Sequence, residues 1–314
     1  MPVRKKTLKR KPVARRATAR AKPAKAVKIP RITYASLKLD ENDHRAYEAA
    51  VGQMRKDLGT HYSNYINGKA RSAPTQDAHA SPADTRLIVS HFPKGTRQDA
   101  KDAIAAARAA QEKWEAMGYK ERNKYLRRAA DLIVERRYLM SATMGFEVGK
   151  NRAESLAEVN ESAELIRYYC EQIEEHKGFV KPLESPAPGQ TTQSVLKPYG
   201  VWAVISPWNF PLALATGMTA GALVAGNAVV FKPASVSPIT GHQLYKAYAD
   251  AGIPNGVFNL VVGPGSQVGQ ELQENEGVDA LVFTGSKEVG MRLYHNFAKN
   301  WPKPVITEMG GKNP

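Results

Sequence analysis

The sequence contains one cysteine, Cys170, among 314 residues, and this scarcity excludes whole classes of protein. A lone cysteine forms neither an intrachain disulfide nor a zinc site built from several thiolates, so we expect no disulfide scaffold and no cysteine-built zinc site, and we assign no residue to a metal. At roughly 150 residues per domain, the length allows two domains, or one large one, around a substantial core. Low cysteine content is typical of a reducing compartment, and we predict a cytoplasmic setting.

Acidic and aromatic residues are both absent from residues 1–31, which carry thirteen lysines and arginines. The other 283 residues carry 32 basic and 30 acidic groups, so the formal charge of +15 belongs almost wholly to this segment. Its few large apolar side chains cannot offset the entropy of ordering, and we predict a disordered basic arm. Such an arm can make salt-sensitive contacts with a polyanion. The absence of aromatics favours the alternative, a solvated tail without a dedicated partner.

Residues 198–231 contain no Asp, Glu, Lys or Arg, as a membrane span would. Pro207, Asn209 and Pro211 interrupt the segment, however. The longest helical piece left is about 15 residues, or ~22 Å, whereas the hydrocarbon layer is ~30 Å thick. We therefore predict a buried strand, turn and helix here, and no contact with a membrane.

Helical spacing of apolar residues marks the region before residue 180. The spacing predicts helices over residues 96–117, 121–144 and 152–176. In the third, apolar residues recur at steps of three and four, at Leu156, Val159, Ala163, Ile166, Cys170 and Ile173. Because a thiol on such a stripe packs as a small hydrophobe, we predict that Cys170 is buried, with a raised pKa, and structural rather than catalytic.

From Val201 onward, short β-branched runs alternate with helical stretches. Nearly continuous apolar strands separated by helices predict an α/β fold, in which a doubly wound, parallel, Rossmann-like sheet is flanked by helices. Sheets of this kind bind ligands at the carboxyl ends of their strands. Residues that follow these strands are therefore candidates for a binding site.

The first strand runs into Ser206-Pro207-Trp208-Asn209-Phe210-Pro211, a turn stiffened by two prolines. An Asn held in this way can donate its amide to an oxygen that acquires negative charge. Alternatively, Asn209 only satisfies backbone groups of the turn. Spacing alone favours that second interpretation.

Two further strand ends carry binding chemistry. Lys232 and Ser235 follow the second strand and suit a ribose or a phosphate, although an ordinary surface lysine is equally compatible with the composition. Residues 283–290, Phe-Thr-Gly-Ser-Lys-Glu-Val-Gly, form a strand, glycine and helix junction whose first-turn amides can hold a pyrophosphate. Gly263, Gly265 and Gly269 miss the G-x-G-x-x-G spacing by one residue.

In this order, PWNFP, FKPAS, FTGSKEVG and ITEMGGKNP resemble the motifs of the aldehyde dehydrogenase superfamily, from about residue 60 to the end of the chain. The segment GFEVGKNRAESLAEVNESAELIRYY further resembles the branch that oxidises L-glutamate γ-semialdehyde, the open form of 1-pyrroline-5-carboxylate. The resemblance implies NAD(P)-dependent oxidation of a small-molecule aldehyde by a homo-oligomer.

The resemblance also implies individual roles. Asn209 is the side-chain donor of an oxyanion hole, and Glu308 is the general base for deacylation, or else a carboxylate that bonds local amides. Lys232 binds the adenosine ribose. Ser235 stands where many NAD-specific members have Glu, which leaves NADP open beside NAD. The remaining positions implied for the cofactor are Ile205, Ser206, Pro207, Trp208, Gly265, Gly269, Phe283, Thr284, Gly285, Ser286, Met309 and Gly310.

The nucleophilic cysteine of the family lies on a loop beyond the Glu308 motif, whereas this sequence stops at Pro314. We therefore expect a cofactor-binding half without the catalytic domain, organised as arm 1–31, amino-terminal strands and helices 32–180, oligomerisation flap 181–200 and Rossmann-like core 201–314. A fragment, a frameshifted gene and a true split protein all remain open. The alternatives are a non-catalytic or partner-completed nucleotide-binding half-protein, or a polyanion-binding protein acting through its arm.

Overall fold

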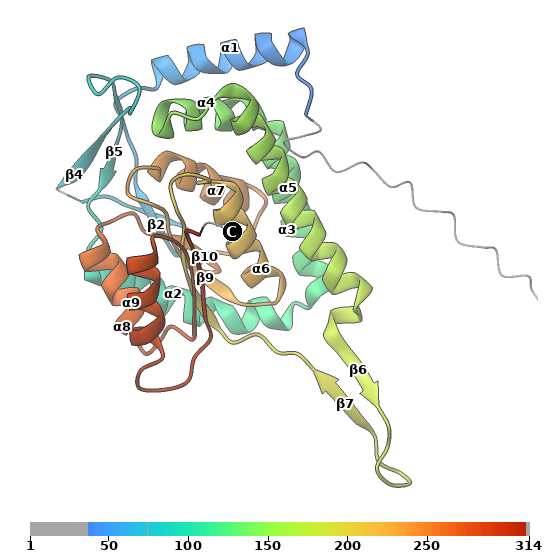
Figure 1. Ribbon diagram of the computed structural model, residues 1–314. Helices are drawn as coiled ribbons and strands as arrows, with labels where there is room; N and C mark the ends of the chain where they lie inside the picture. The colour runs from blue at the N-terminus through green and yellow to red at the C-terminus, as the bar shows by residue number, and fades with distance from the viewer. Residues whose placement is uncertain (1–36, 74, 312–314) are drawn as a thin grey trace, which may run out of the picture. The chain divides into compact units, whose positions relative to one another are not determined.

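The computed structural model describes residues 37–73 and 75–311 (Figure 1). The chain divides into two units, Met1–Arg31 and Ile32–Pro314. The predicted basic arm lies outside the described residues, and the second unit contains every element below. Within the described ranges, no helix is both long enough and apolar enough to span a membrane.

The second unit alternates helices and strands. Its helices are α1 (Glu41–Lys56), α2 (Arg97–Ala116), α3 (Tyr119–Glu135), α4 (Arg137–Val148), α5 (Arg152–Glu175), α6 (Ala213–Val224), α7 (Pro238–Asp250), α8 (Gln270–Glu274) and α9 (Lys287–Phe297), with short turns at Lys177–Phe179 and Gly265–Gly269. Its strands are β1 (Thr60–His61), β2 (Asn64–Ile66), β3 (Lys69–Arg71), β4 (Gln76–Ala80), β5 (Ile88–Pro93), β6 (Val180–Leu183), β7 (Thr192–Val195), β8 (Val201–Ile205), β9 (Ala228–Lys232), β10 (Phe258–Leu260), β11 (Ala280–Gly285) and β12 (Val305–Met309).

A seven-stranded sheet with the order β12-β11-β8-β9-β10-β2-β3 forms the centre of this unit. The five strands from β12 to β10 are parallel, and β2 and β3 extend the sheet in antiparallel fashion. From β8 the chain first adds β9 and β10 on one side and then returns to add β11 and β12 on the other side. The direction in which strands are added therefore reverses between β8 and β11. This arrangement confirms the predicted doubly wound sheet, and its switch point is where such folds bind ligands.

Helices cover both faces of the sheet, as its apolar strands require (Figure 1). On one face, α6 and α7 pack on the strands and are themselves covered by α3, α4 and α5. On the other face, α2, α8 and α9 enclose a second apolar cluster. The strand ends that hold the candidate residues therefore emerge between two helical layers.

Two small sheets lie outside this central layer. Strands β1, β5 and β4 form one, and β6 and β7 form a two-stranded antiparallel hairpin that extends away from the helices (Figure 1). All residues of the hairpin strands are exposed, including Val180, Leu183 and Val195. The hairpin falls within or beside residues 181–200, and its role in oligomerisation stays a prediction.

Two details of the helical region differ from expectation. The helix predicted over 121–144 is two helices, because Arg136 leaves the helical conformation (φ −97°, ψ 11°) and binds Asp250 on α7 through an ion pair of 2.7 Å. The break redirects α4 so that it packs on α1, α5 and α7. Helix α1 was not anticipated from the sequence, although Asp40 and Asp43 form a capping box at its start.

Cys170 lies on the buried stripe of α5, as predicted, with no exposed surface. Burial raises the pKa of its thiol to about 12. We therefore expect no reaction with an aromatic disulfide reagent at pH 8 in native buffer, and one equivalent of reaction after unfolding in urea. Rapid stoichiometric labelling of the native chain would show that the thiol is accessible and contradict this assignment.

Candidate functional site

The register of the sheet brings the predicted strand ends together at one edge. Ile205 pairs with Lys232 on one side and with Phe283 on the other. The Ser206 amide donates to the Lys232 carbonyl oxygen at 3.2 Å, so the two loops diverge from the same point. Gly285 pairs with Met309 across the next two strands. Segments separated by up to about a hundred residues therefore form one continuous edge.

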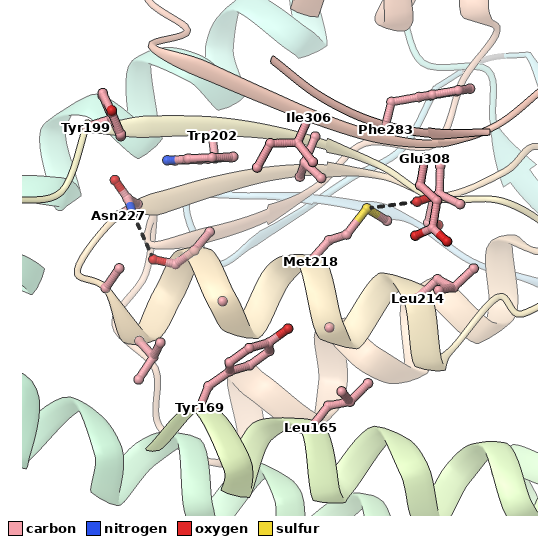
Figure 2. Close-up of a pocket in the computed structure, with 18 of the residues that line it drawn as sticks. Leu165, Tyr169, Tyr199, Trp202, Leu214, Met218, Asn227, Phe283, Ile306 and Glu308 are labelled. Carbon is pink, nitrogen blue, oxygen red and sulfur yellow. Dashed lines mark hydrogen bonds between the residues drawn. The ribbon is translucent and has the colours of Figure 1, made fainter. Parts of the chain in front are cut away.

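A cleft of about 2190 Å³ opens at this edge (Figure 2). Eleven of the predicted site residues line it, from the ends of β8, β11 and β12. They are Ser206, Pro207, Trp208, Asn209, Phe283, Thr284, Gly285, Ser286, Glu308, Met309 and Gly310. The cleft exceeds the ~300–1,000 Å³ of an ordinary small-ligand site.

The remainder of the cleft is an apolar groove between α5, α6 and the sheet. Leu165 and Tyr169 point from α5 toward α6, and Met218 of α6 lies between that helix and the strands (Figure 2). Ile306 of β12 faces the groove and is 54% exposed. The groove therefore presents apolar surface directly beside the polar strand ends.

Asn209 lies in the turn formed by residues 206–211, which we call the Asn209 turn. Its Oδ1 accepts a hydrogen bond from the Phe210 amide at 3.1 Å, and its backbone oxygen accepts one from Lys150 Nζ at 2.9 Å. Among the described residues, Nδ2 of Asn209 has no hydrogen-bond partner. The turn therefore fixes the carboxamide through its oxygen and leaves two N–H donors for a ligand.

Lys232 is a buried cation at the end of β9, only 6% exposed. Its Nζ donates to the Pro233 carbonyl oxygen at 3.2 Å, which uses one of its three N–H groups. Burial lowers the pKa of this amine to about 8. No carboxylate among the described residues forms an ion pair with it, so a ligand with hydroxyl or phosphate oxygens would supply acceptors that the ammonium lacks.

The junction between β11 and α9 has the form expected of an anion site. Ser286 is the N-cap of α9, and its hydroxyl accepts from the Val289 amide at 3.4 Å. Gly290 packs so closely that a Cβ there would lie 2.5 Å from Met309 Sδ. The glycine thus brings the first turns of α9 against the end of β12, with the amino end of the helix facing the cleft.

The other predicted cofactor residues lie outside the main cleft. Ile205 is buried within the core. Gly269 adjoins the Lys232 side chain, because a Cβ on this glycine would lie 3.9 Å from Lys232 Cε. Gly265 faces open space. Ser235 lines a separate hollow of about 140 Å³ together with Asp77 and Lys94, among others. Because Lys94 Nζ lies 3.6 Å from Asp77 Oδ1, the charges of these two side chains nearly cancel beside Ser235.

Glu308 is exposed on the edge strand β12, opposite Thr284 of β11, and its side chain faces the cleft (Figure 2). Cys170 is not one of the residues that line the cleft. The described residues contain no cluster of three or more His, Cys, Asp or Glu side chains that could hold a metal. The cleft therefore combines the amide donor of Asn209 and the carboxylate of Glu308 without a thiol, and the Lys232 cation lies outside its lining, at the same edge of the sheet.

Residues 70–314 match the family described as the aldehyde dehydrogenase family. The chain belongs to this family. Within it, the chain is 37% identical to 1-pyrroline-5-carboxylate dehydrogenase 2 of Bacillus subtilis over 87% of the chain and 54% of that protein. It is also 37% identical to alpha-ketoglutarate semialdehyde dehydrogenase of Haloferax volcanii, over 80% of the chain and 52% of that protein.

Solved structures of the family agree with this fold. A 1-pyrroline-5-carboxylate dehydrogenase from Thermus with bound NAD superposes with a TM-score of 0.82 at 33% identity, over 87% of the chain and 54% of that structure. Betaine aldehyde dehydrogenase from Staphylococcus aureus in complex with NAD+ gives 0.79 at 30% identity, over 86% and 53%. The chain thus spans about half the length of the relatives that it matches.

Two residues that the sequence did not point to bind the Asn209 turn and the start of α6. Lys150 and Glu158 form a buried ion pair with an N–O distance of 2.5 Å. Both lie within the segment that resembles the semialdehyde branch of the aldehyde dehydrogenase family. Their spacing of eight residues matches no local helix pairing. Only their contacts in the folded chain connect them to the site.

Proposed function

We propose that the carboxyl edge of the sheet binds NAD, with NADP as the alternative, and serves the oxidation of a small aldehyde. The buried Lys232 ammonium carries this proposal, because its two remaining N–H groups need acceptors. Ser206 Oγ is likewise buried without a hydrogen-bond partner among the described residues. Ribose hydroxyls and phosphate oxygens fit both needs, and the NAD-bound relatives support this choice.

In this proposal, each group at the edge has a task. Lys232 binds a ribose, and Ser286 with the first turn of α9 binds the pyrophosphate. A bound nicotinamide dinucleotide supplies the acceptor for hydride. Asn209 Nδ2 donates to the aldehyde oxygen as negative charge develops on it. Glu308 accepts a proton from the water that hydrolyses the acylated enzyme.

We propose L-glutamate γ-semialdehyde as the aldehyde, on the support of the 1-pyrroline-5-carboxylate dehydrogenases among the relatives. The reaction of this family uses a thiolate, and Cys170 is buried away from the cleft. We therefore propose that these residues act as the cofactor-binding half and that another polypeptide segment supplies the thiol. Pairing of copies through the β6–β7 hairpin and a cytoplasmic setting belong to the same proposal.

Calorimetric titration of the 314-residue chain with NAD and with NADP tests the binding function. We expect saturable binding of NAD, in the range of roughly 1 μM to 1 mM that is usual for enzyme ligands. The near-cancelled charge around Ser235 predicts a difference of less than about tenfold between the two dinucleotides. Failure of the folded chain to bind either dinucleotide would contradict the proposal.

Oxidation by the isolated chain is a separate test. We expect no increase in absorbance at 340 nm when NAD and the semialdehyde are mixed with the purified chain, because no accessible thiol adjoins the cleft. Sustained NADH formation would contradict the assignment of Cys170. A Cys170→Ala variant would then show whether that thiol is the nucleophile.

A further inference from the structure

We infer that Lys150 and Glu158 are positioning residues that hold the Asn209 turn in its ligand-binding geometry. This inference rests on the proposed function, in which Asn209 donates to the substrate. Neither residue lines the cleft itself. Each acts through backbone groups of the turn and of the helix that follows it.

The first part of the argument is the contact of Lys150 with the turn. Its side chain is 6% exposed, and its Nζ donates to the Asn209 carbonyl oxygen at 2.9 Å. The same ammonium lies 3.5 Å from the centroid of the Phe210 ring. A buried cation that binds a carbonyl oxygen and an aromatic face at once restricts both residues. Lys150 thereby restrains the backbone of Asn209 through its carbonyl oxygen.

The second part is the contact of Glu158 with α6. Its Oε1 accepts from the amides of Leu212 and Ala213 at 2.8 and 3.0 Å. These amides are at the start of α6, directly after the turn, and they have no intrahelical partner. A fully buried carboxylate therefore fixes where α6 begins and, with it, the carboxyl end of the turn.

The two contacts form one unit, because Glu158 Oε2 binds Lys150 Nζ while Oε1 binds the helix. Replacing either charge leaves the other buried without its partner. The unit connects residues 150–158 to Asn209 and to the start of α6, so displacement of the pair would move Asn209 relative to the strand ends. Simple packing side chains would not impose this directional restraint.

The matched control lies at the opposite end of α6. The buried Arg122 donates to the Val224 carbonyl oxygen through Nε and Nη2, at 3.3 and 3.1 Å. Arg122 belongs to α3. An Arg122→Met variant therefore removes a buried charge and its hydrogen bonds to the carboxyl end of α6, far along the helix from the turn. It reports the effect of general destabilisation.

Hydrogen exchange of the full 314-residue chain, read by mass spectrometry, tests the inference without any nucleotide. We expect the hydrogen-bonded amides of Phe210, Leu212 and Ala213 to exchange about tenfold faster in Lys150→Met than in wild type, because the restraint on the turn is lost. Lys150→Arg, which keeps the charge, should recover part of the protection. Arg122→Met should leave these amides unchanged. Unchanged exchange in Lys150→Met, or equal acceleration in Arg122→Met, would overturn the inference.

Nucleotide affinity adds a readout that general destabilisation would not change. In the proposed site, NAD would extend from Lys232 to the Asn209 turn, whereas AMP would bind only near Lys232. We expect Lys150→Met and Glu158→Gln to weaken NAD binding about fivefold and to leave AMP binding within twofold of wild type. Parallel loss of both affinities, or no loss of either, would overturn the inference. If wild type binds neither nucleotide, the proposed function fails, and the exchange experiment still decides the role of the pair.

Discussion

Replacing Lys232 with methionine should make the chain more stable and weaken its binding of NAD. The pKa of this buried amine falls from 10.5 to about 8, which corresponds to a cost of about 3 kcal/mol for the charged form at pH 7. Methionine removes that cost. Loss of the charged hydrogen bonds that we propose between Lys232 and the ribose should weaken binding by about tenfold or more. Urea unfolding and NAD titration of both proteins measure the two effects.

The pH dependence provides an independent check of the same lysine. Between pH 8 and 10.5 the unfolded chain binds a proton at Lys232 that the folded chain has lost, so Lys232 contributes a rise in stability across this window. Lys232→Met should lack this rise. Lys246→Met, at a partly exposed lysine paired with Asp250, is the control and should change neither stability nor affinity appreciably. A Lys232→Met protein that is less stable than wild type at pH 7 would refute the assignment.

Replacing Gly200 with alanine should produce the largest loss of stability, about 4 kcal/mol, from two independent causes. Its φ of +130° is a conformation that side chains rarely adopt. A Cβ would also overlap Asp279 Oδ2 and lie 2.8 Å from Arg108 Nη1. Asp279 accepts from the Val201 amide at 2.7 Å, so its displacement would release the first residue of β8. Urea unfolding at constant pH measures the loss.

Gly59→Ala is the matched control for this substitution. Gly59 also has a positive φ, +75°, but a Cβ there meets nothing within 4 Å. The control should lose only about 1–2 kcal/mol, which is the conformational cost alone. Equal losses in the two variants would mean that the Asp279 contact contributes nothing.

The parallel core could be predicted from sequence because its determinants are local. Each buried strand is an apolar run, each run ends in a polar turn, and topology then places Ser206, Lys232 and Gly285 at one edge. No further information is needed to bring these strand ends together. The detailed roles of the residues at that edge remain predictions until a ligand is titrated.

Some of the missed elements did leave signals in the sequence. Asn67 and Gly68, both with positive φ, join β2 to β3 as a two-residue hairpin turn, and Asn-Gly between short strands is a usual mark of that turn. In contrast, Glu158 contacts amides more than fifty residues away, at Leu212 and Ala213. No periodicity encodes such a contact, because it depends on how α5 crosses the start of α6.

The antiparallel addition of β2 to the sheet has a consequence for biosynthesis. Asn64 exchanges hydrogen bonds with both backbone groups of Val262, across 198 residues of sequence. While the nascent chain leaves the ribosome, the β2–β3 hairpin therefore has no sheet to join until translation has passed β10. Closure of so long a loop makes docking of this hairpin a late step of folding, after the local helices have formed.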